Sequence, residues 1–269
     1  MNNILSCSAG CVLALVGSAA SSQSTELDPL EVDLELVLAA DRSGSMSADL
    51  RSSQRLGFAA AFRDRELQRA IVSGPIGKIA VLYFEWSDRA DQEVIIPWTV
   101  LASAEDMNAF ANTLQHAAIA SDGGETSISA AMMFAVEELE TNRFSSYRRV
   151  VDISGNGRNS SGQPVEIGLR ALRAVGATVN GLALPETTYG NAGPYDKLFT
   201  GFDGPIEDYY RREVIGGPGA FAIVVDPDNG FADEILRKLV LEVAWNGSTN
   251  DFHGRKPATM MTTETPSFR

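Results

Sequence analysis

Two kinds of apolar pattern alternate along the chain between residues 32 and 243. Short, nearly continuous apolar runs predict buried strands, and they occur at 32–40, 78–84, 93–100, 149–154, 178–184 and 220–225. Longer stretches with apolar residues at helical spacing predict helices, at 48–70, 104–118, 128–141, 165–175, 205–214 and 231–243. This alternation predicts an α/β fold in which helices cover both faces of a mostly parallel sheet.

Pro97 lies inside the third predicted strand. Because proline has no N–H to donate to a neighbouring strand, we expect this strand at an edge of the sheet. No shift in composition divides the core, so we expect one domain over residues 32–249. Within it, residues 185–219 form a long insertion that is rich in Gly, Pro, Tyr and Asp.

The two ends of the chain differ from this core. Residues 4–20 are apolar or small and carry no charge, which predicts a signal peptide over residues 1–20, cleaved near Ala20. Residues 21–31 are expected to form an extended leader, and the polar tail 250–269 to be disordered. Export follows from the signal peptide. A single membrane anchor is the alternative, although the apolar run is shorter than the roughly 20 residues that a span needs.

The charge balance and the cysteines narrow the function. The chain of 269 residues has 22 Lys and Arg against 35 Asp and Glu, for a net charge of −13. Such a surface repels phosphate backbones and anionic lipid, which disfavours nucleic-acid and membrane binding and favours cationic ligands or metal ions. Both cysteines, Cys7 and Cys11, precede the expected cleavage site. The exported protein is therefore expected to contain no disulfide, zinc–thiolate site or cysteine nucleophile.

Three predicted loops at the carboxyl ends of strands are rich in oxygen-bearing side chains. Ligands bind at these ends in open parallel sheets, where the strand order reverses. The first loop spaces Asp41, Ser43 and Ser45 so that one carboxylate and two hydroxyls can face a common point. The second loop contributes Thr126 at the start of a helix, and the third contributes Asn156 between two glycines. Hard oxygen ligands of this kind suit Mg²⁺, Mn²⁺ or Ca²⁺.

Each loop taken alone also has a structural explanation. The first loop could simply cap the following helix, and Thr126 could be a helix N-cap. The glycines of the third loop could serve only a tight turn.

Taken together, the three loops resemble those of a von Willebrand factor type A (vWA) domain. The motifs are D-x-S-x-S after the first strand, G-G-x-T about eighty residues later and a polar-Gly turn after the next strand, over roughly residues 32–241. The phrases S-G-N-G-R-N and R-R-E-V-I-G-G-P-G-A-F are similar to the bacterial exported DUF1194 family. The resemblance implies a doubly wound, vWA/Rossmann-like sheet of six strands in the order 3-2-1-4-5-6, with one antiparallel edge strand. It also implies a bacterial source and a periplasmic or secreted location.

The resemblance also implies a metal-ion-dependent adhesion site (MIDAS). Its ligands would be Asp41, Ser43, Ser45, Thr126 and Asn156, holding Mg²⁺, or Mn²⁺ or Ca²⁺, while an acidic side chain of a protein partner completes the coordination. The family usually has Asp at the position that Asn156 occupies, so we expect weaker metal binding here. Asp152 is the nearest substitute carboxylate, but its place inside a strand favours structural hydrogen bonds.

Two other functions are open. A hydrolase would need a nucleophile and a base, yet His116 and His253 lack the context of a catalytic triad, and the chain contains no G-x-S-x-G, H-E-x-x-H or P-loop motif. We therefore expect no enzymatic activity. The other function is a structural or interaction domain whose metal site has degenerated, which Asn156 would explain. Aromatic residues at 83–86 and the segment 208–212 are interpreted as core and rim packing rather than as a binding face.

Overall fold

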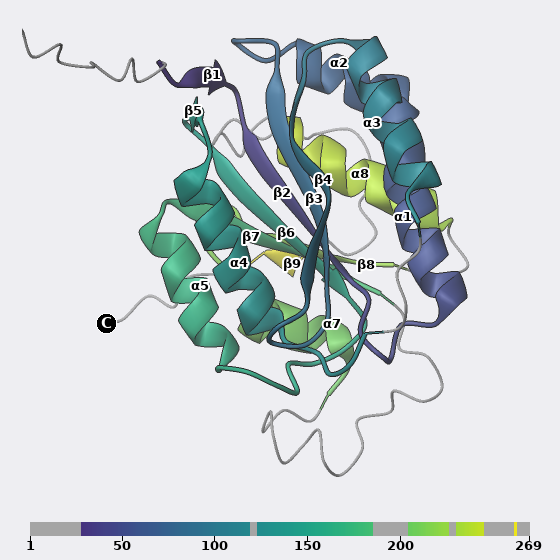
Figure 1. Ribbon diagram of the computed structural model, residues 1–269, viewed down its shortest axis with the longest axis vertical. Coiled ribbons are helices and arrows are strands. Elements are labelled where there is room, and N and C mark those ends of the chain that lie inside the picture. Colours follow the sequence, from purple (N-terminus) through teal and green to yellow (C-terminus); the bar gives the residue numbers. More distant parts are fainter. Residues whose placement is uncertain (1–27, 119–122, 185–203, 226–229, 245–260, 263–269) are drawn as a thin grey trace, which may run out of the picture.

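A seven-stranded sheet forms the centre of the molecule in this computed structural model, which describes residues 28–118, 123–184, 204–225, 230–244 and 261–262 (Figure 1). In spatial order its strands are β4 (Gln92–Leu101), β3 (Ile79–Trp86), β2 (Glu35–Asp41), β6 (Arg149–Gly155), β7 (Ala177–Ala183), β8 (Phe221–Val224) and β9 (Met261–Thr262). The five strands from β3 to β8 run parallel, whereas β4 and β9 pair antiparallel at the two edges.

The predicted α/β architecture is confirmed. All six predicted strands form, in the order 3-2-1-4-5-6, and the strand that contains Pro97 is the antiparallel edge strand β4. The predicted strand count was wrong by one, because β9 extends the sheet beyond β8. β9 lies within the tail for which we expected disorder. Its two residues pair with the outer edge of β8, whose backbone groups would otherwise lack a strand partner.

Helices cover both faces of the sheet (Figure 1). One face packs against α1 (Ala48–Arg63), α2 (Arg65–Val72), α3 (Ala104–His116) and α8 (Phe231–Ala244). The other packs against α4 (Ile128–Thr141), α5 (Val165–Ala174), α7 (Ile206–Tyr209) and the π-helix η1 (Tyr210–Val214). Strand β2 is buried on both sides, because Leu36 and Leu38 enter the first apolar core while Val37 and Ala39 enter the second. A continuous apolar run is typical of such a central strand.

The helix predicted over residues 48–70 is two helices. Asp64 has an extended backbone between α1 and α2, and its carboxylate accepts a hydrogen bond from the N–H of Glu66 at 2.6 Å. An aspartate that caps a new helix in this way satisfies a backbone donor that would otherwise lack a partner. The apolar periodicity continues across the break, which is why the sequence pattern alone did not reveal it.

A second, two-stranded parallel sheet joins β1 (Leu30–Val32) to β5 (Phe144–Ser146). β1 is separated from β2 at Asp33, whose carboxylate accepts hydrogen bonds from the backbone N–H groups of Ile76 at 2.9 Å and Gly77 at 2.8 Å. The expected extended leader therefore ends in a short paired strand. Neither β1 nor β5 was predicted as a separate strand, because three residues are too few to show a period.

Several sequence predictions fall outside the described residues. These are the signal peptide over 1–20, most of the leader, the tail apart from β9, His253 and residues 185–203 of the insertion. The end of the insertion forms α7 and η1, where the short helix at 205–214 was expected. Among the described helices, none is long and apolar enough to cross a lipid bilayer.

Candidate metal centre

Asp41 ends strand β2 and is fully buried. Its Oδ1 accepts a hydrogen bond from the backbone N–H of Ser43 at 2.7 Å, while Gln54 of α1 donates to its backbone carbonyl at 3.1 Å. Its Oδ2 has no hydrogen-bond partner within the part of the chain that the structure describes. Burial raises the pKa of Asp41 to about 6, against the lowering effect of hydrogen bonds from Ser43 and from the backbone of Asn156 and of the positive charge of Arg51. A buried carboxylate oxygen without a partner is costly, so this oxygen is available to bind a cation or to accept a hydrogen bond.

Ser45 contacts both Ser43 and Asn156. The hydroxyl oxygens of Ser43 and Ser45 are 3.2 Å apart, and Ser45 Oγ donates to Oδ1 of Asn156 at 2.7 Å. The amide of Asn156 in turn donates to the backbone carbonyl of Ser45 at 3.1 Å. The first and third loops, far apart in the sequence, are therefore joined through the side chains that the sequence proposed as ligands.

Thr126 lies near these residues, because backbone hydrogen bonds join its loop to both the first and the third loop. The N–H of Gly44 donates to the carbonyl of Gly124 at 2.9 Å, and the N–H of Ser160 donates to the carbonyl of Thr126 at 2.8 Å. A methyl group added to Gly157 would lie 3.1 Å from Thr126 Oγ1 and 3.5 Å from Ser45 Oγ. The glycine thus leaves open a small space that these two hydroxyls border.

The helix-cap explanations do not account for these residues. Ser47, not the D-x-S-x-S loop, caps α1, and its hydroxyl accepts from the N–H of Leu50 at 3.2 Å. The residue before α4 is Ser127, so Thr126 is not its N-cap. The oxygen atoms of Asp41, Ser43, Ser45 and Thr126 are therefore not needed to terminate a helix.

Asp152 lies away from this group, as its position inside the strand predicted. It lies in the middle of β6 and faces α8, where its Oδ1 is 2.7 Å from Nζ of Lys238, and both side chains are buried. Asp152 is therefore occupied by an ion pair and does not replace the carboxylate that Asn156 lacks.

The donor set fits a hard divalent cation. One carboxylate, three hydroxyls and one amide oxygen come from loops that hydrogen bonds hold together. Oxygen donors of this kind are typical of Mg²⁺ and Ca²⁺ sites, which in addition keep waters as ligands. The described residues contain no group of three or more His, Cys, Asp or Glu that could hold a metal.

Sequence reasoning missed three residues that shape this centre. Gln54 bridges the carbonyl of Asp41 to the hydroxyl of Ser154, at 3.1 and 2.7 Å. Arg42 forms ion pairs with Asp91 and Glu93, and so ties the first loop to the β3–β4 turn. Tyr210 of η1 approaches Asp41 from the far side of β6. No local pattern signals these roles, because each depends on a segment distant in the sequence.

The remaining sequence candidates lie where they were expected. Tyr83, Phe84 and Trp86 are buried in the two cores, and His116 is exposed at the end of α3, with Nδ1 2.8 Å from the carbonyl of Asn112. The aromatic residues of β3 are therefore packing residues, as interpreted.

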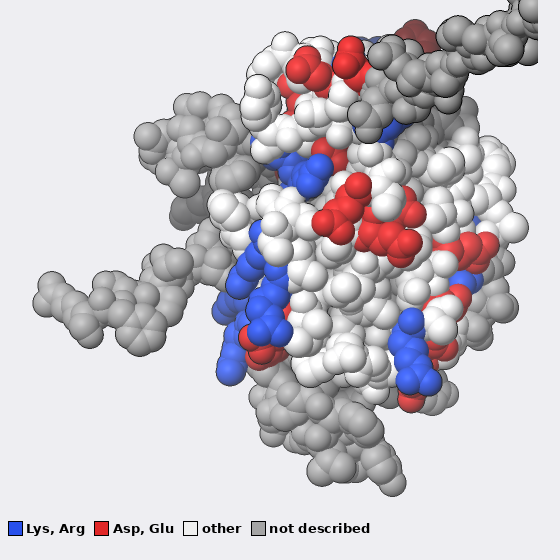
Figure 2. All heavy atoms as spheres, turned by 60° about the vertical axis from the view of Figure 1, so that its left-hand side comes forward, with Lys and Arg blue, Asp and Glu red and all other residues white. Residues whose placement is uncertain are grey.

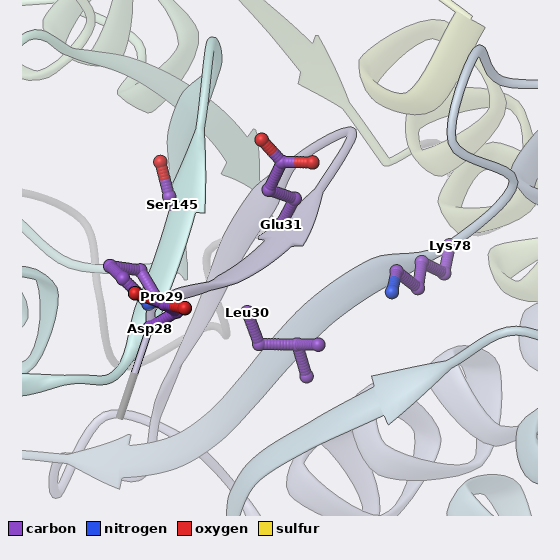
Figure 3. Close-up of a pocket in the computed structure, with 6 residues that line it drawn as sticks. All are labelled: Asp28, Pro29, Leu30, Glu31, Lys78 and Ser145. Atoms are coloured by element: carbon purple, nitrogen blue, oxygen red, sulfur yellow. The ribbon is translucent and has the colours of Figure 1, made fainter. Parts of the chain in front are cut away.

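Two hollows on the described surface lie apart from the metal centre. One, of about 450 Å³, is lined by Lys78, Glu31 and other residues near the amino ends of the strands (Figure 3). The other, of about 440 Å³, lies beside α4 and is lined by Met133, Glu137 and Glu140 among others. On the face shown in Figure 2, a group of acidic side chains lies near the centre, and basic side chains lie beside acidic ones on either side of it. Neither hollow contains any of the five candidate ligands.

The family model described as "Protein of unknown function (DUF1194)" matches residues 31–247. The chain belongs to this family. No curated protein matches the sequence of this DUF1194 protein. Its strand order, with helices on both faces, is that of a vWA-like, Rossmann-like fold.

Solved structures share this fold at low sequence identity. Proximal thread matrix protein 1 from the mussel byssus, in a structure titled with a zinc-occupied MIDAS motif, is 18% identical, with a TM-score of 0.50 over 81% of this chain and 49% of that one. The pilus adhesin SpaC from Lactobacillus rhamnosus GG is 13% identical, with a TM-score of 0.51 over 80% and 31%. A von Willebrand factor type A protein from Catenulispora acidiphila is 12% identical, with a TM-score of 0.49 over 79% and 43%. This DUF1194 protein thus spans about half the length of the mussel protein and 31% of the pilus adhesin, and the likeness concerns the fold alone.

Proposed function

We propose that this protein is an exported, non-enzymatic binding domain that holds a divalent cation and uses it to engage an acidic side chain of a protein partner. The cation would be held by Asp41, Ser43, Ser45, Thr126 and Asn156, directly or through water. The observation that supports the proposal is that hydrogen bonds join the three loops that carry these residues at the carboxyl edge of the sheet. Mg²⁺ is the first candidate, with Mn²⁺ and Ca²⁺ as alternatives.

The charge of the site supports binding to a carboxylate. Asp41 is the only formally charged side chain among the five, and the other four supply neutral oxygens. A bound divalent cation would therefore remain net positive and attract a carboxylate from outside. The acidic balance of the chain, with a net charge of −13, does not exclude an acidic partner, because the cation mediates the contact.

Calorimetric titration of the purified protein with Mg²⁺ and Mn²⁺ tests the site. We expect binding in the wild type, none in Asp41→Ala and at least tenfold weaker binding in Ser45→Ala. Ser47→Ala is the matched control, because it removes a serine hydroxyl two residues away that only caps α1. Absence of binding to the wild type at millimolar metal, or equal binding by Asp41→Ala, would contradict the proposal.

Capture of partners tests the second half of the proposal. Tagged wild-type protein and Asp41→Ala would be incubated with an envelope fraction, each with Mg²⁺ or with EDTA. A partner that the wild type retains only with Mg²⁺, and that Asp41→Ala does not retain, is expected. A partner captured equally under all four conditions would place the interface elsewhere.

Export is part of the proposal and has its own test. The apolar segment 1–20 supports it, so the protein recovered from outside the cytoplasm should begin close to residue 21. Determination of the amino terminus of the mature protein decides this. An intact first segment in a membrane fraction would instead support the anchor.

One observation favours a metal-free interaction domain as the second candidate. Ser45 and Asn156 already satisfy each other by two hydrogen bonds, so this pair needs no cation to be stable. Under this alternative the partner binds equally well in EDTA, and the titration shows no metal binding.

A further inference from the structure

Tyr210, the first residue of η1, is a fully buried tyrosine with an unpartnered hydroxyl. Its Oη has no hydrogen-bond partner within the described segments, and the same is true of Asp41 Oδ2. Both oxygens face Gly155, the last residue of β6. A Cβ atom placed on Gly155 would lie 2.8 Å from Tyr210 Oη and 2.7 Å from Asp41 Oδ2. Two unsatisfied oxygens, from segments distant in the sequence, thus lie beside the same glycine.

Two glycines make the space that the tyrosine occupies. A Cβ atom on Gly181 of β7 would lie 2.8 Å from Cδ1 of the Tyr210 ring, just as one on Gly155 would meet its hydroxyl. Any other residue at either position would press against the phenol or against Asp41. The ring therefore lies against Gly181 of β7, and its hydroxyl lies against Gly155 of β6, next to the Asp41 carboxylate.

The chemistry of the two groups is complementary. Asp41 Oδ1 already accepts from the N–H of Ser43, so Oδ2 is the oxygen that remains to be satisfied. A neutral phenol carries one proton that it can donate, whereas a carboxylate can only accept. Burial and the nearby Asp41 raise the pKa of Tyr210 well above its ordinary value, which keeps the phenol neutral. A buried oxygen left without a partner is costly, so a hydrogen bond between the two groups would stabilise both.

We propose that Tyr210 is a positioning residue for the metal centre: its hydroxyl donates to Oδ2 of Asp41, directly or through one water, and fixes the orientation of the carboxylate. The role in cation binding rests on the proposed function above, whereas the hydrogen bond itself does not. With Oδ2 held toward η1, the carboxylate keeps Oδ1 on the N–H of Ser43. The adjacent Tyr209 reaches the third loop, because its hydroxyl accepts from the N–H of Asn159 at 3.2 Å.

A double-mutant cycle in EDTA tests the hydrogen bond without any metal. Urea unfolding would be measured for the wild type, Tyr210→Phe, Asp41→Ala and the double variant. We expect Tyr210→Phe to raise the unfolding equilibrium constant about tenfold in the wild-type background and less than twofold when Asp41 is absent. Equal factors in the two backgrounds would overturn the proposal.

Two further variants keep this test decisive. Tyr209→Phe removes the neighbouring hydroxyl and should show equal factors in both backgrounds, because its partner is Asn159. If Asp41→Ala does not fold, Asp41→Asn replaces it. Tyr210→Phe should then change the unfolding equilibrium constant by a smaller factor in the Asp41→Asn background than in the wild type, since a neutral amide oxygen is a weaker acceptor than a carboxylate. The difference between these two factors should be about half of that expected with Asp41→Ala. Equal factors with Asp41→Asn would again overturn the proposal.

Metal titration then tests the positioning role. Tyr210→Phe should weaken Mg²⁺ binding about fivefold, and Tyr209→Phe by less. An unchanged dissociation constant in Tyr210→Phe, with binding intact in the wild type, would overturn the positioning role. If the wild type itself binds no Mg²⁺, the proposed function fails, while unequal factors in EDTA would still establish the bond between Tyr210 and Asp41.

Discussion

Lys238 of α8 lies 2.7 Å from Asp152 in the middle of β6, and the two side chains are 1% and 0% exposed. Lys238 also contacts Glu242, one turn along the same helix, and Asn180 of β7 donates to Glu242 Oε1 at 2.9 Å. These four residues, the Lys238 cluster, place two carboxylates and one ammonium between helix and sheet. The cluster attaches α8 to the central strands and occupies the one carboxylate of β6 that could have served the metal centre.

Removing the cation from the Lys238 cluster should destabilise the fold strongly. Lys238→Met leaves two buried carboxylates without their shared counter-charge, a change that typically costs about 3–5 kcal/mol. Urea unfolding at pH 8 measures it. Arg237→Met, the adjacent residue of α8, is the control, because its contact with Glu234 at 3.6 Å is partly exposed and worth about 0–1 kcal/mol. Equal losses for the two variants would contradict the structural role of Lys238.

The free energy of unfolding should depend on pH through the titration of Asp152. Burial, with a further contribution from Glu242, raises the pKa of Asp152 to about 7, against the attraction of Lys238. The folded protein therefore holds a proton that the unfolded chain releases above about pH 4. The contribution of this group to stability is full below pH 4 and declines as the pH rises to 7, by up to about 1.4 kcal/mol per pH unit.

Comparison with Asp152→Asn isolates this pH dependence from that of the other carboxylates. The free energy of unfolding would be measured for both proteins between pH 4 and 8. The difference, wild type minus variant, should fall as the pH rises through this window. A difference that stays constant, or that rises with pH, would show that Asp152 is ionised throughout.

Asn156→Asp should lower the stability of the metal-free protein and raise its affinity for Mg²⁺. The amide of Asn156 donates to the carbonyl of Ser45, and a carboxylate there would face that carbonyl oxygen without a proton to share. The metal-free variant should therefore be less stable than the wild type by about 1–2 kcal/mol. A second formal negative charge should in turn tighten Mg²⁺ binding by about tenfold or more. Thermal unfolding with and without Mg²⁺ measures both effects, and tighter binding without the stability loss would mean that the amide contact is unimportant.

Gly155→Ala should damage the metal centre through sterics alone. The added methyl would lie 2.7 Å from Asp41 Oδ2 and 2.8 Å from Tyr210 Oη, so at least one of them must move. Forcing an extra methyl into a filled space costs about 1–3 kcal/mol, and metal binding should weaken as Asp41 shifts. Adding Tyr210→Phe removes one of the two clashing atoms and should restore part of the stability. No recovery in the double variant would show that the backbone, rather than the phenol, limits the space.

Local patterns were enough to predict most of the sheet. The continuous apolar run of β2 indicated a strand buried on both faces, and it packs against both cores. Pro97 placed β4 at an edge, which needs no knowledge of its neighbours because a missing N–H is a property of the residue itself. The break at Asp64 escaped prediction, since the apolar spacing of α1 continues into α2 and only the cap marks the boundary.

The candidate ligands could also be identified from the sequence, although their contacts could not. The spacing of Asp41, Ser43 and Ser45 within one loop indicated oxygen ligands, and the structure places Asn156 in contact with Ser45. The sequence contained no indication that Asp152 has Lys238 as a counter-charge, or that β9 would pair with β8.

The sequence by itself determined which segments form strands and helices, which faces are buried and which loops carry oxygen-bearing side chains, because periodicity and residue type act within a few residues. Only the tertiary structure decided which distant groups meet. Tyr210 reaches Asp41 because Gly155 and Gly181 leave room across two neighbouring strands, a relation that depends on strand register and packing. Such contacts arise when the sheet assembles, and no local pattern in the chain contains them.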